Sequence, residues 1–173
     1  GSVSSAGDIN GDGYDDIIIG GREIYVVFGK SSGFSSSLYL SSLNGSNGFR
    51  LYGVDRLDHS GVSVSSAGDV NGDGYGDIII GASGADPDGK DRAGESYVVF
   101  GKSSGFSSSL DLSSLDGSNG FRLDGVDASD YSGYSVSSAG DVNGDGYGDV
   151  IIGAFQAAPD GKTEAGESYV VFG

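Results

Sequence analysis

The chain has 173 residues and a formal net charge of −16, because 25 acidic residues face only 9 Lys and Arg. This acidity excludes nucleic acids and anionic membrane surfaces as partners, since phosphate contacts need cationic side chains; no apolar stretch is long enough for membrane insertion. Neither Met nor Cys occurs, so disulfides are excluded and we expect a processed, excised or engineered piece.

A repeat organises the chain from its first residues onward. Residues 2–20, 61–81 and 133–153 each carry S-V-S-S-A-G-D-[IV]-N-G-D-G-Y-x-D-[IV]-I-I-G, and each copy is followed by Y-V-V-F-G. Two long linking segments, 30–54 and 102–126, also match each other. Self-similarity at such a period is typical of repeat architectures, in which each copy forms one structural unit.

Each repeat is expected to contain four short strands. In the second copy they fall at residues 64–67, 77–82, 96–100 and 121–124. The continuous apolar run at 77–82 is typical of a strand buried on both faces. Beyond a helical turn near the Leu pairs of each linking segment, no helix is predicted.

Four antiparallel strands per repeat predict an all-β fold made of β-propeller blades. The blades are expected at residues 1–54, 55–126 and 127–173, the first with a short loop between its second and third strands and the last without its outer strand. A propeller ring needs about 4–8 blades. We therefore expect this partial propeller to be closed by oligomerisation, most simply as a homodimer that forms a six-bladed ring.

A nine-residue acidic loop separates the first and second strands of every repeat. Oxygen-bearing side chains occupy its positions 1, 3, 5 and 9, position 7 offers a backbone carbonyl, and position 6 is a Gly that tolerates positive φ. This pattern suits Ca²⁺, which takes six to eight oxygen ligands, better than Mg²⁺ or Zn²⁺. The candidate metal ligands are Asp8, Asn10, Asp12, Tyr14, Asp16, Asp69, Asn71, Asp73, Tyr75, Asp77, Asp141, Asn143, Asp145, Tyr147 and Asp149.

These loops predict about three Ca²⁺ ions per chain. An EF-hand is excluded because its position 12 needs a Glu between flanking helices, whereas this chain has Ile19, Ile80 or Ile152 there and strand-like flanks. The alternative is a plain acidic hairpin turn that holds no metal.

The motif D-x-N-G-D-G-Y-x-D-[IV]-I-I-G-A, preceded by G-Y-S-V, resembles the FG-GAP repeat of integrin α-subunit β-propellers and of bacterial secreted proteins. The resemblance covers essentially the whole chain. It implies a structural calcium ion in the first hairpin of each blade, held by the fifteen residues named above. It also implies an extracellular or cell-surface location and a role in cell adhesion or protein interaction. The family's Gly-Ala-Pro is replaced by G-A-S at 81–83 and G-A-F at 153–155.

No catalytic set can be recognised, so we do not expect an enzyme. The single His, His59, is replaced by Tyr131 in the next repeat and is predicted to be a solvated loop residue. No nucleophile elbow, the strand-to-helix turn that presents the Ser of a G-x-S-x-G motif, is recognised. The segments 84–91 and 156–163 approach a phosphate-binding loop but do not complete it, and they are interpreted as surface hairpin loops.

The copies differ most in the loops between the second and third strands (83–94, 155–166) and in the connectors between blades (53–60, 125–132). A protein or glycan ligand is therefore expected on this face, opposite the calcium loops. One alternative is a lectin-like carbohydrate-binding propeller that stacks sugars on Tyr131, Tyr134 or Phe155. Others are the propeller of a polysaccharide-active enzyme and a designed or excised fragment without a ligand.

Overall fold

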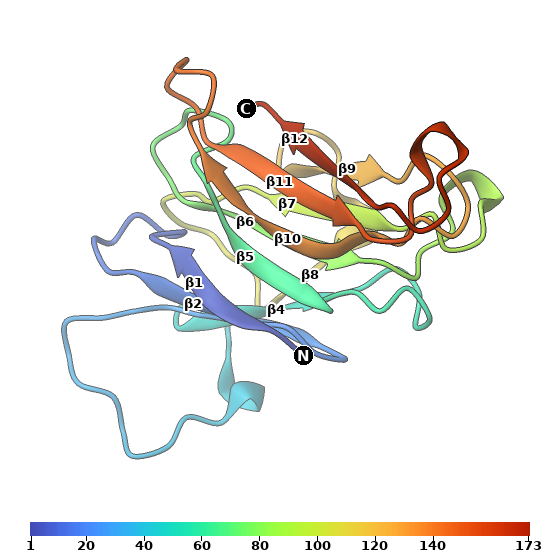
Figure 1. The fold of residues 1–173 in the computed structure, drawn as a ribbon. Coiled ribbons are helices and arrows are strands. Elements are labelled where there is room, and N and C mark those ends of the chain that lie inside the picture. Colours follow the sequence, from blue (N-terminus) through green and yellow to red (C-terminus); the bar gives the residue numbers. More distant parts are fainter.

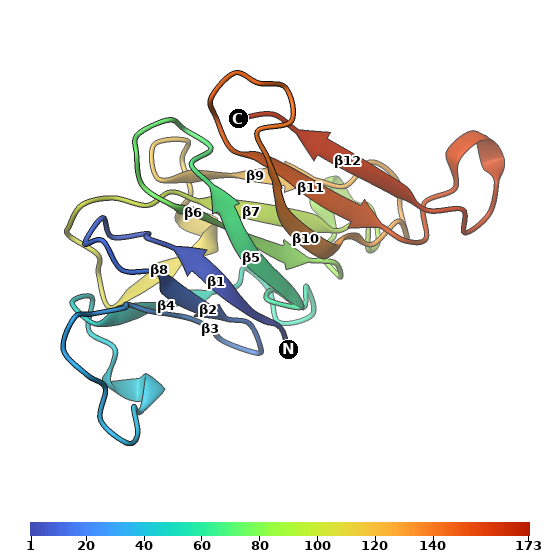
Figure 2. The ribbon, with the colours of Figure 1, turned by 60° about the vertical axis from the view of Figure 1, so that its left-hand side comes forward.

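The computed structural model describes residues 1–173 as three sheets set side by side, like the blades of a partial propeller (Figure 1). The strand orders are β1-β2-β3-β4-β8, β5-β6-β7-β9 and β10-β11-β12. The strands β1, β5 and β10 lie next to one another along one edge of the assembly (Figures 1 and 2). The elements are β1 (Val3–Gly7), β2 (Asp16–Ile19), β3 (Ile24–Val27), η1 (Leu40–Ser42), β4 (Gly48–Tyr52), β5 (Ser63–Gly68), β6 (Asp77–Ala82), η2 (Pro87–Gly89), β7 (Glu95–Val99), β8 (Ser109–Asp111), η3 (Leu112–Ser114), β9 (Gly120–Asp124), β10 (Ser132–Gly140), β11 (Asp149–Ala154), η4 (Pro159–Gly161) and β12 (Glu167–Val171).

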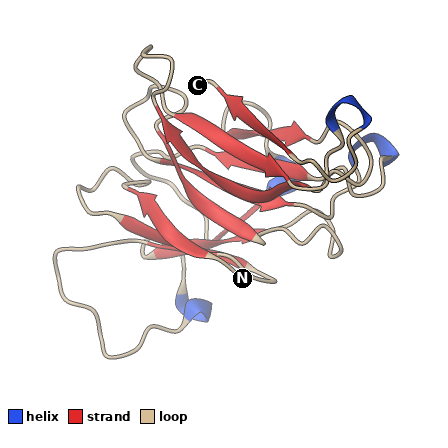
Figure 3. Cartoon of the chain, in the orientation of Figure 1, coloured by secondary structure: helices blue, strands red, loops and turns tan.

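The predicted strands of the second repeat are confirmed. They correspond to β5, β6, β7 and β9, and β6 agrees with its expected range at both ends. Neighbouring strands within each repeat pair antiparallel, which confirms the all-β fold and its four-stranded blade. The only helical segments are single 3₁₀ turns (Figure 3), and none has the length or the apolar character that a membrane crossing requires.

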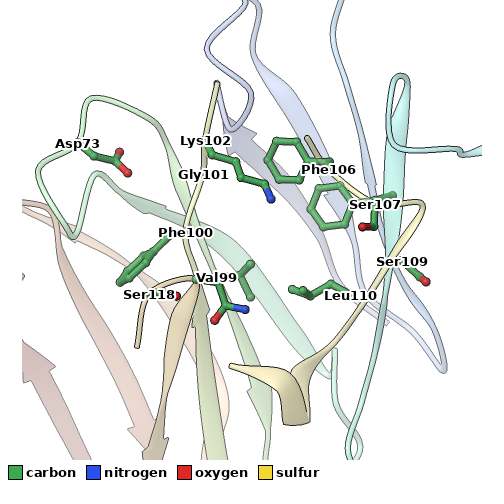
Figure 4. Close-up of a pocket in the computed structure, with 12 residues that line it drawn as sticks. Asp73, Val99, Phe100, Gly101, Lys102, Phe106, Ser107, Ser109, Leu110 and Ser118 are labelled. Atoms are coloured by element: carbon green, nitrogen blue, oxygen red, sulfur yellow. The ribbon is translucent and has the colours of Figure 1, made fainter. Parts of the chain in front are cut away.

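A fifth strand, β8, joins the first sheet and was not expected. It belongs to the segment that follows β7, yet it pairs in parallel with β4, the outer strand of the first sheet. Its anchor is Phe106, which stacks on Phe49 with ring centroids 4.9 Å apart and meets Phe28 edge-on at 5.3 Å. A cavity of about 310 Å³ lies beside this cluster, between Phe106 and Val99 (Figure 4). The segment that follows β7 therefore adds a strand to the outer edge of the first sheet and links the second repeat to the first.

The hydrophobic core lies between the sheets rather than within any one of them. One cluster of 16 buried residues joins the first two sheets, and a second cluster of 7 joins the second and third. Strand β6 is buried on both faces, as expected, because a sheet covers each of them. Strands β2 and β11 have similar apolar sequences but expose Ile17 and Ile151, respectively. Their sheets stand at the ends of the row, so each has a face with no neighbour.

The variable loops share one face of the molecule, as predicted. The backbone N–H of Gly84, in the β6–β7 loop, donates to the carbonyl of Asp58 in the preceding connector at 2.9 Å. The N–H of Tyr131, in the next connector, donates to the carbonyl of Arg92 in the same loop at 3.1 Å. Loops and connectors therefore support each other at the end of the strands opposite the acidic loops.

Glu95 on β7 and Asp130 are buried carboxylic acids that lie outside the acidic loops. The carboxylate of Glu95 accepts the hydroxyl of Tyr97, and its Oε1 lies 3.5 Å from Nη1 of Arg122. Burial raises the pKa of Glu95 above its ordinary value, although the Tyr97 hydroxyl and the Arg122 charge lower it. The ionised form of this group is therefore less favourable in the folded chain than in the unfolded chain.

The stability of a Glu95→Gln variant relative to the parent is expected to increase as the pH rises. The folded pKa lies above the unfolded value, so ionisation of Glu95 lowers the parent's free energy of unfolding once the pH passes the unfolded pKa. The loss is complete above the folded pKa. Urea denaturation of both proteins in saturating calcium, between about pH 4 and pH 7, measures the difference. A relative stability that stays constant or falls with rising pH would contradict this prediction.

Candidate metal centre

Each acidic loop begins at a β-bulge at the end of an inner strand. In the first repeat the register between β1 and β2 shifts between Ser5 and Gly7, and Gly7 adopts a φ of 68°. The bulge turns the chain outward into residues 8–16, which return as β2. At loop position 6, Gly13 has a φ of 87°, as predicted. Strands flank every loop, which confirms that none is an EF-hand.

The side chains at loop positions 1, 3 and 5 point inward and converge. Oxygens of both Asp8 and Asn10 accept the backbone N–H of Asp12, at 3.0 and 2.9 Å, and the second Asp8 oxygen accepts that of Gly13 at 2.9 Å. The carboxylate of Asp12 in turn accepts the N–H of Tyr14 at 3.0 Å. The other two loops repeat this pattern. Each loop thus gathers two carboxylates and an amide oxygen around its own backbone.

The Asp at position 9 behaves differently, because it is buried in all three repeats. Its two oxygens in the second copy, Asp77, accept the N–H of Val70 and the N–H of Gly101, both at 2.8 Å. The first bond closes the loop, and the second ties it to the chain that leaves β7. This carboxylate is therefore a strap that joins three segments of one blade.

Burial raises the pKa of Asp77 to about 6, against the opposing effect of its two backbone hydrogen bonds, and the charges of Asp73 and Asp69 raise it further. The pKa of Asp16 rises to about 6 for the same reasons. Burial thus makes the anionic form of Asp77 and Asp16 less favourable in the folded chain than in the unfolded chain.

The donor set matches the oxygen chemistry of Ca²⁺, although the acidic side chains do not form a closed cluster. No group of three or more His, Cys, Asp or Glu side chains lies close enough together to hold a metal ion. The loop amides occupy the inward-facing oxygens, and the strap uses both of its oxygens on backbone N–H groups. A carboxylate offers about four lone-pair sites, so these hydrogen bonds leave sites on each oxygen for a cation.

The tyrosine at position 7 has a second role that the loop pattern alone did not predict. A Cβ added to Gly11 would lie 2.3 Å from the ring of Tyr75, and one added to Gly72 would lie 2.3 Å from the ring of Tyr147. Each ring therefore covers the acidic loop of the preceding blade. Backbone bonds accompany it, because the N–H of Gly148 donates to the carbonyl of Asp69 at 2.6 Å. The Gly that recurs at loop position 4 is the sequence signal for this contact, because a side chain there would collide with the ring.

The other residues considered for catalysis, His59 and residues 84–91, lie in loops, as predicted. His59 is exposed, in the connector before β5, with a φ of 58°. Residues 84–91 belong to the β6–β7 loop and contain the 3₁₀ turn η2 rather than the start of a helix. In that loop the carboxylate of Asp86 accepts the backbone N–H of Arg92 at 2.7 Å, and this hydrogen bond stabilises the loop conformation.

The sequence model of the FG-GAP repeat matches residues 1–22, 60–99 and 132–171, which is more than half of the chain. The chain belongs to the FG-GAP repeat family. Each matched segment begins near an inner strand and contains one acidic loop with its two flanking strands. This membership confirms the resemblance and the propeller-type fold.

Several integrin α chains are similar to this FG-GAP chain. Integrin alpha-4 of Xenopus laevis is 32% identical over 167 residues, covering 90% of this chain and 14% of the relative. Integrin alpha pat-2 of Caenorhabditis elegans is 32% identical over 180 residues, covering 100% of this chain and 14% of the relative. Phosphatidylinositol-glycan-specific phospholipase D of Bos taurus is 35% identical over 113 residues, covering 65% of this chain and 13% of the relative. The chain thus spans about one seventh of the length of the integrin chains that it matches.

Proposed function

We propose that this chain is a calcium-binding FG-GAP propeller module that serves as an extracellular or cell-surface scaffold for adhesion and protein interaction. The observation that carries the proposal is the convergence of Asp, Asn and Asp oxygens in three equivalent loops of a family member similar to integrin α chains. The role is non-enzymatic. Calcium, about three ions per chain, is structural, and the ligands are the fifteen residues at loop positions 1, 3, 5, 7 and 9.

A structural role for calcium follows from the way the loops are connected. The first and second loops each lie under a tyrosine ring of the next blade and share a backbone hydrogen bond with that blade. An ion that neutralises the crowded carboxylates would also fix the loop surface on which that ring rests. Calcium bound in one blade would in this way stiffen the joint to the next.

Calcium is expected to raise the thermal midpoint of the chain, because a ligand that binds only the folded state stabilises it by about 2.7 kcal/mol per site at a hundredfold excess over Kd. Melting curves in millimolar calcium, in magnesium and in chelator measure the effect. A variant carrying Asp73→Ala and Asp145→Ala should lose most of the response. The control carries Asp88→Ala and Asp160→Ala, the same charge change in the loops of the opposite face, and should keep it. A parent chain that does not respond to calcium would refute the metal site.

We further propose that residues 1–54, 55–126 and 127–173 act as three blades and that two copies of the chain close a six-bladed ring as a homodimer. The third sheet has three strands. A protein or glycan ligand would then bind on the face opposite the calcium loops. On that face a hollow of about 650 Å³ is lined by Arg22, Arg56 and His59, among other residues. Arg22 and Arg56 are cationic, and the same hollow is also lined by the acidic Glu23 and Asp55.

A carbohydrate-binding role is the second candidate, supported by an aromatic cluster on the same face. Phe155 lies 4.5 Å from Tyr134 and 5.6 Å from Tyr131, measured between ring centroids. Tyr134 and Phe155 are about half exposed and border a hollow of about 390 Å³. Exposed rings of this kind offer flat apolar surfaces to sugars. A glycan array probed with the parent chain and with Phe155→Ala tests this role, and an array without any Phe155-dependent signal would exclude it.

A further inference from the structure

The two connectors between blades, residues 53–60 and 125–132, share one local conformation. In each of them the carboxylate of the sixth residue accepts the backbone N–H of the third. Asp58 accepts the N–H of Asp55 at 3.0 Å, and Asp130 accepts that of Asp127 at 3.2 Å. Because the connectors form the same turn, a difference in their contacts reflects a difference in the loops around them.

The second connector is bonded to the β6–β7 loop of the second blade. The carbonyls of residues 91–94 in that loop accept four backbone N–H groups of the connector, at distances of 2.8 to 3.1 Å. The donors are Gly125, Ser129, Tyr131 and Ser132. A short segment of the loop thus satisfies one whole side of the connector.

The first connector has no such loop beside it. Between the equivalent Gly and Glu residues that flank it, the β2–β3 turn has two residues, 21–22, where the β6–β7 loop has thirteen, 82–94. None of the four corresponding N–H groups in the first connector donates to a backbone carbonyl. We call them the open amides, and they belong to Gly53, Leu57, His59 and Ser60.

The open amides border the hollow of about 650 Å³ on the face opposite the acidic loops, because all four of their residues line it. The side-chain oxygen of Ser60 is also buried there without a hydrogen-bond partner. The hollow therefore lies where the missing loop residues would run, and it is bordered by the donors that such residues satisfy in the next blade. This difference lies inside the chain, between two joints whose blades are both present.

Two residue differences between the repeats place cations at the open connector alone. Arg22 stands where the second repeat has Gly94, and Arg56 stands where it has Ala128. Both Arg residues line the hollow, and neither takes part in an ion pair. The joint that lacks the loop is thus also the joint that carries unpaired guanidinium groups.

Two carboxylates line the same hollow, but they do not cancel this charge. Glu23 accepts the hydroxyl of Tyr25 and lies 3.6 Å from Nε of Arg50, which lies outside the lining. Asp55 accepts the backbone N–H of Arg56. Two unpaired guanidinium groups therefore face one carboxylate that has no cationic partner, so the hollow favours an anionic occupant.

From the open amides, the hollow and its cations we infer that this joint binds a short loop of a partner protein that carries carboxylate side chains. Backbone carbonyls of that loop would accept the open amides, as residues 91–94 do in the next blade. Its carboxylates would pair with Arg22 and Arg56. This inference rests on the interaction role proposed above and deepens it by identifying the binding surface and the chemistry of the ligand.

A titration of the full ¹⁵N-labelled chain in saturating calcium, followed by NMR, tests the inference. The probe is a cyclic peptide of residues 82–95 that carries Lys90→Ala and Arg92→Ala, which leaves only acidic charges. Ala82 and Glu95 are paired across β6 and β7, so cyclisation keeps the loop ends together and reduces the entropy lost on binding. The signals of the open amides should shift along a saturable curve with a dissociation constant of about 1 mM or lower.

The charge preference is tested with a second peptide that also carries Asp86→Asn, Asp88→Asn and Asp91→Asn. It should bind at least about tenfold more weakly than the acidic peptide. Rising salt should weaken the acidic peptide more than the Asn form, because exposed charges are screened.

A loop graft tests the position of the site. Replacing residues 21–22 by the sequence of residues 82–94 should fill the hollow with the chain's own backbone. The open amides of the graft should then resemble those of the peptide-saturated parent, and added peptide should no longer move them.

The double variant Arg22→Gly with Arg56→Ala introduces the residues of the second repeat without changing the loop length, so it tests the site even if the graft does not fold. Its open amides should still shift, but it should bind the acidic and Asn peptides equally. The control carries Lys30→Ala and Lys162→Ala, which removes two charges from exposed residues outside the hollow, and it should keep the tenfold preference.

Several outcomes would overturn the inference. These are open amides that do not move with the acidic peptide, an Asn peptide that binds the parent equally well, a folded graft that still responds, and an Arg double variant that keeps the preference. Shifts produced by maltohexaose but not by the peptide would overturn it in favour of a carbohydrate site. A chain whose thermal midpoint rises with calcium but whose open amides ignore the peptide would lose this inference and keep the metal proposal, so the two failures are distinguishable.

Discussion

Replacing Asp77 by Ala is expected to lower the free energy of unfolding by about 2–4 kcal/mol, even when calcium is absent. The substitution leaves the buried N–H groups of Val70 and Gly101 without an acceptor, and each such group costs about 1–3 kcal/mol. Removal of a carboxylate whose burial is unfavourable offsets part of this loss, since the Asp77 pKa is already raised to about 6. Asp77 should therefore contribute to the free energy of unfolding whether or not an ion is bound.

Urea denaturation in chelator, with Asp73→Ala as the control, separates the structural role of the Asp77 hydrogen bonds from its role as a proposed metal ligand. Asp73 is exposed, and its carboxylate accepts one backbone N–H within the loop, so its loss should cost about 1 kcal/mol or less in chelator. In calcium both variants should lose stability relative to the parent. If Asp77→Ala costs no more than Asp73→Ala in chelator, position 9 is not a structural strap.

Replacing Gly72 by Ala should destabilise the chain by about 2–4 kcal/mol, because two penalties act together. The backbone φ of 73° is unfavourable for a residue with a Cβ, and that Cβ would lie 2.3 Å from the ring of Tyr147. The ring would have to leave the loop of the second blade. We expect the joint between the second and third blades to loosen in consequence.

Gly74→Ala is the matched control for the backbone penalty. Gly74 has a φ of 88°, but a Cβ added there would have no atom within 4 Å, so only the conformational cost of about 1–2 kcal/mol applies. The double variant Gly72→Ala with Tyr147→Ala should recover part of the difference, which a double-mutant cycle in urea quantifies. Equal losses for Gly72→Ala and Gly74→Ala would show that the ring does not constrain the loop.

Several features of the tertiary structure could not be predicted from local sequence. Residues 109–111 have no strand signal of their own, and they become β8 only because Phe106 stacks on Phe49 in another sheet. The equivalent residues of the first repeat, 37–39, read S-L-Y instead of S-L-D and form no strand. Phe34, the equivalent of Phe106, is exposed and stacks on no other ring, so closely similar sequences have different local structures.

The sequence by itself determined the repeat, the strand positions, the flanks of the acidic loops and the glycines that need positive φ. These depend on short-range rules: alternation and apolar runs specify strands, and only Gly accepts the loop backbone at positions such as Gly13.

The tertiary structure alone decided what each apolar residue faces. Ile18 and Ile151 occupy equivalent positions, yet one is buried and the other exposed, because burial depends on whether a neighbouring sheet is present. It also decided that the Asp at position 9 is a buried strap, since its partners Val70 and Gly101 lie 7 and 24 residues away along the chain and meet only after the strands pair.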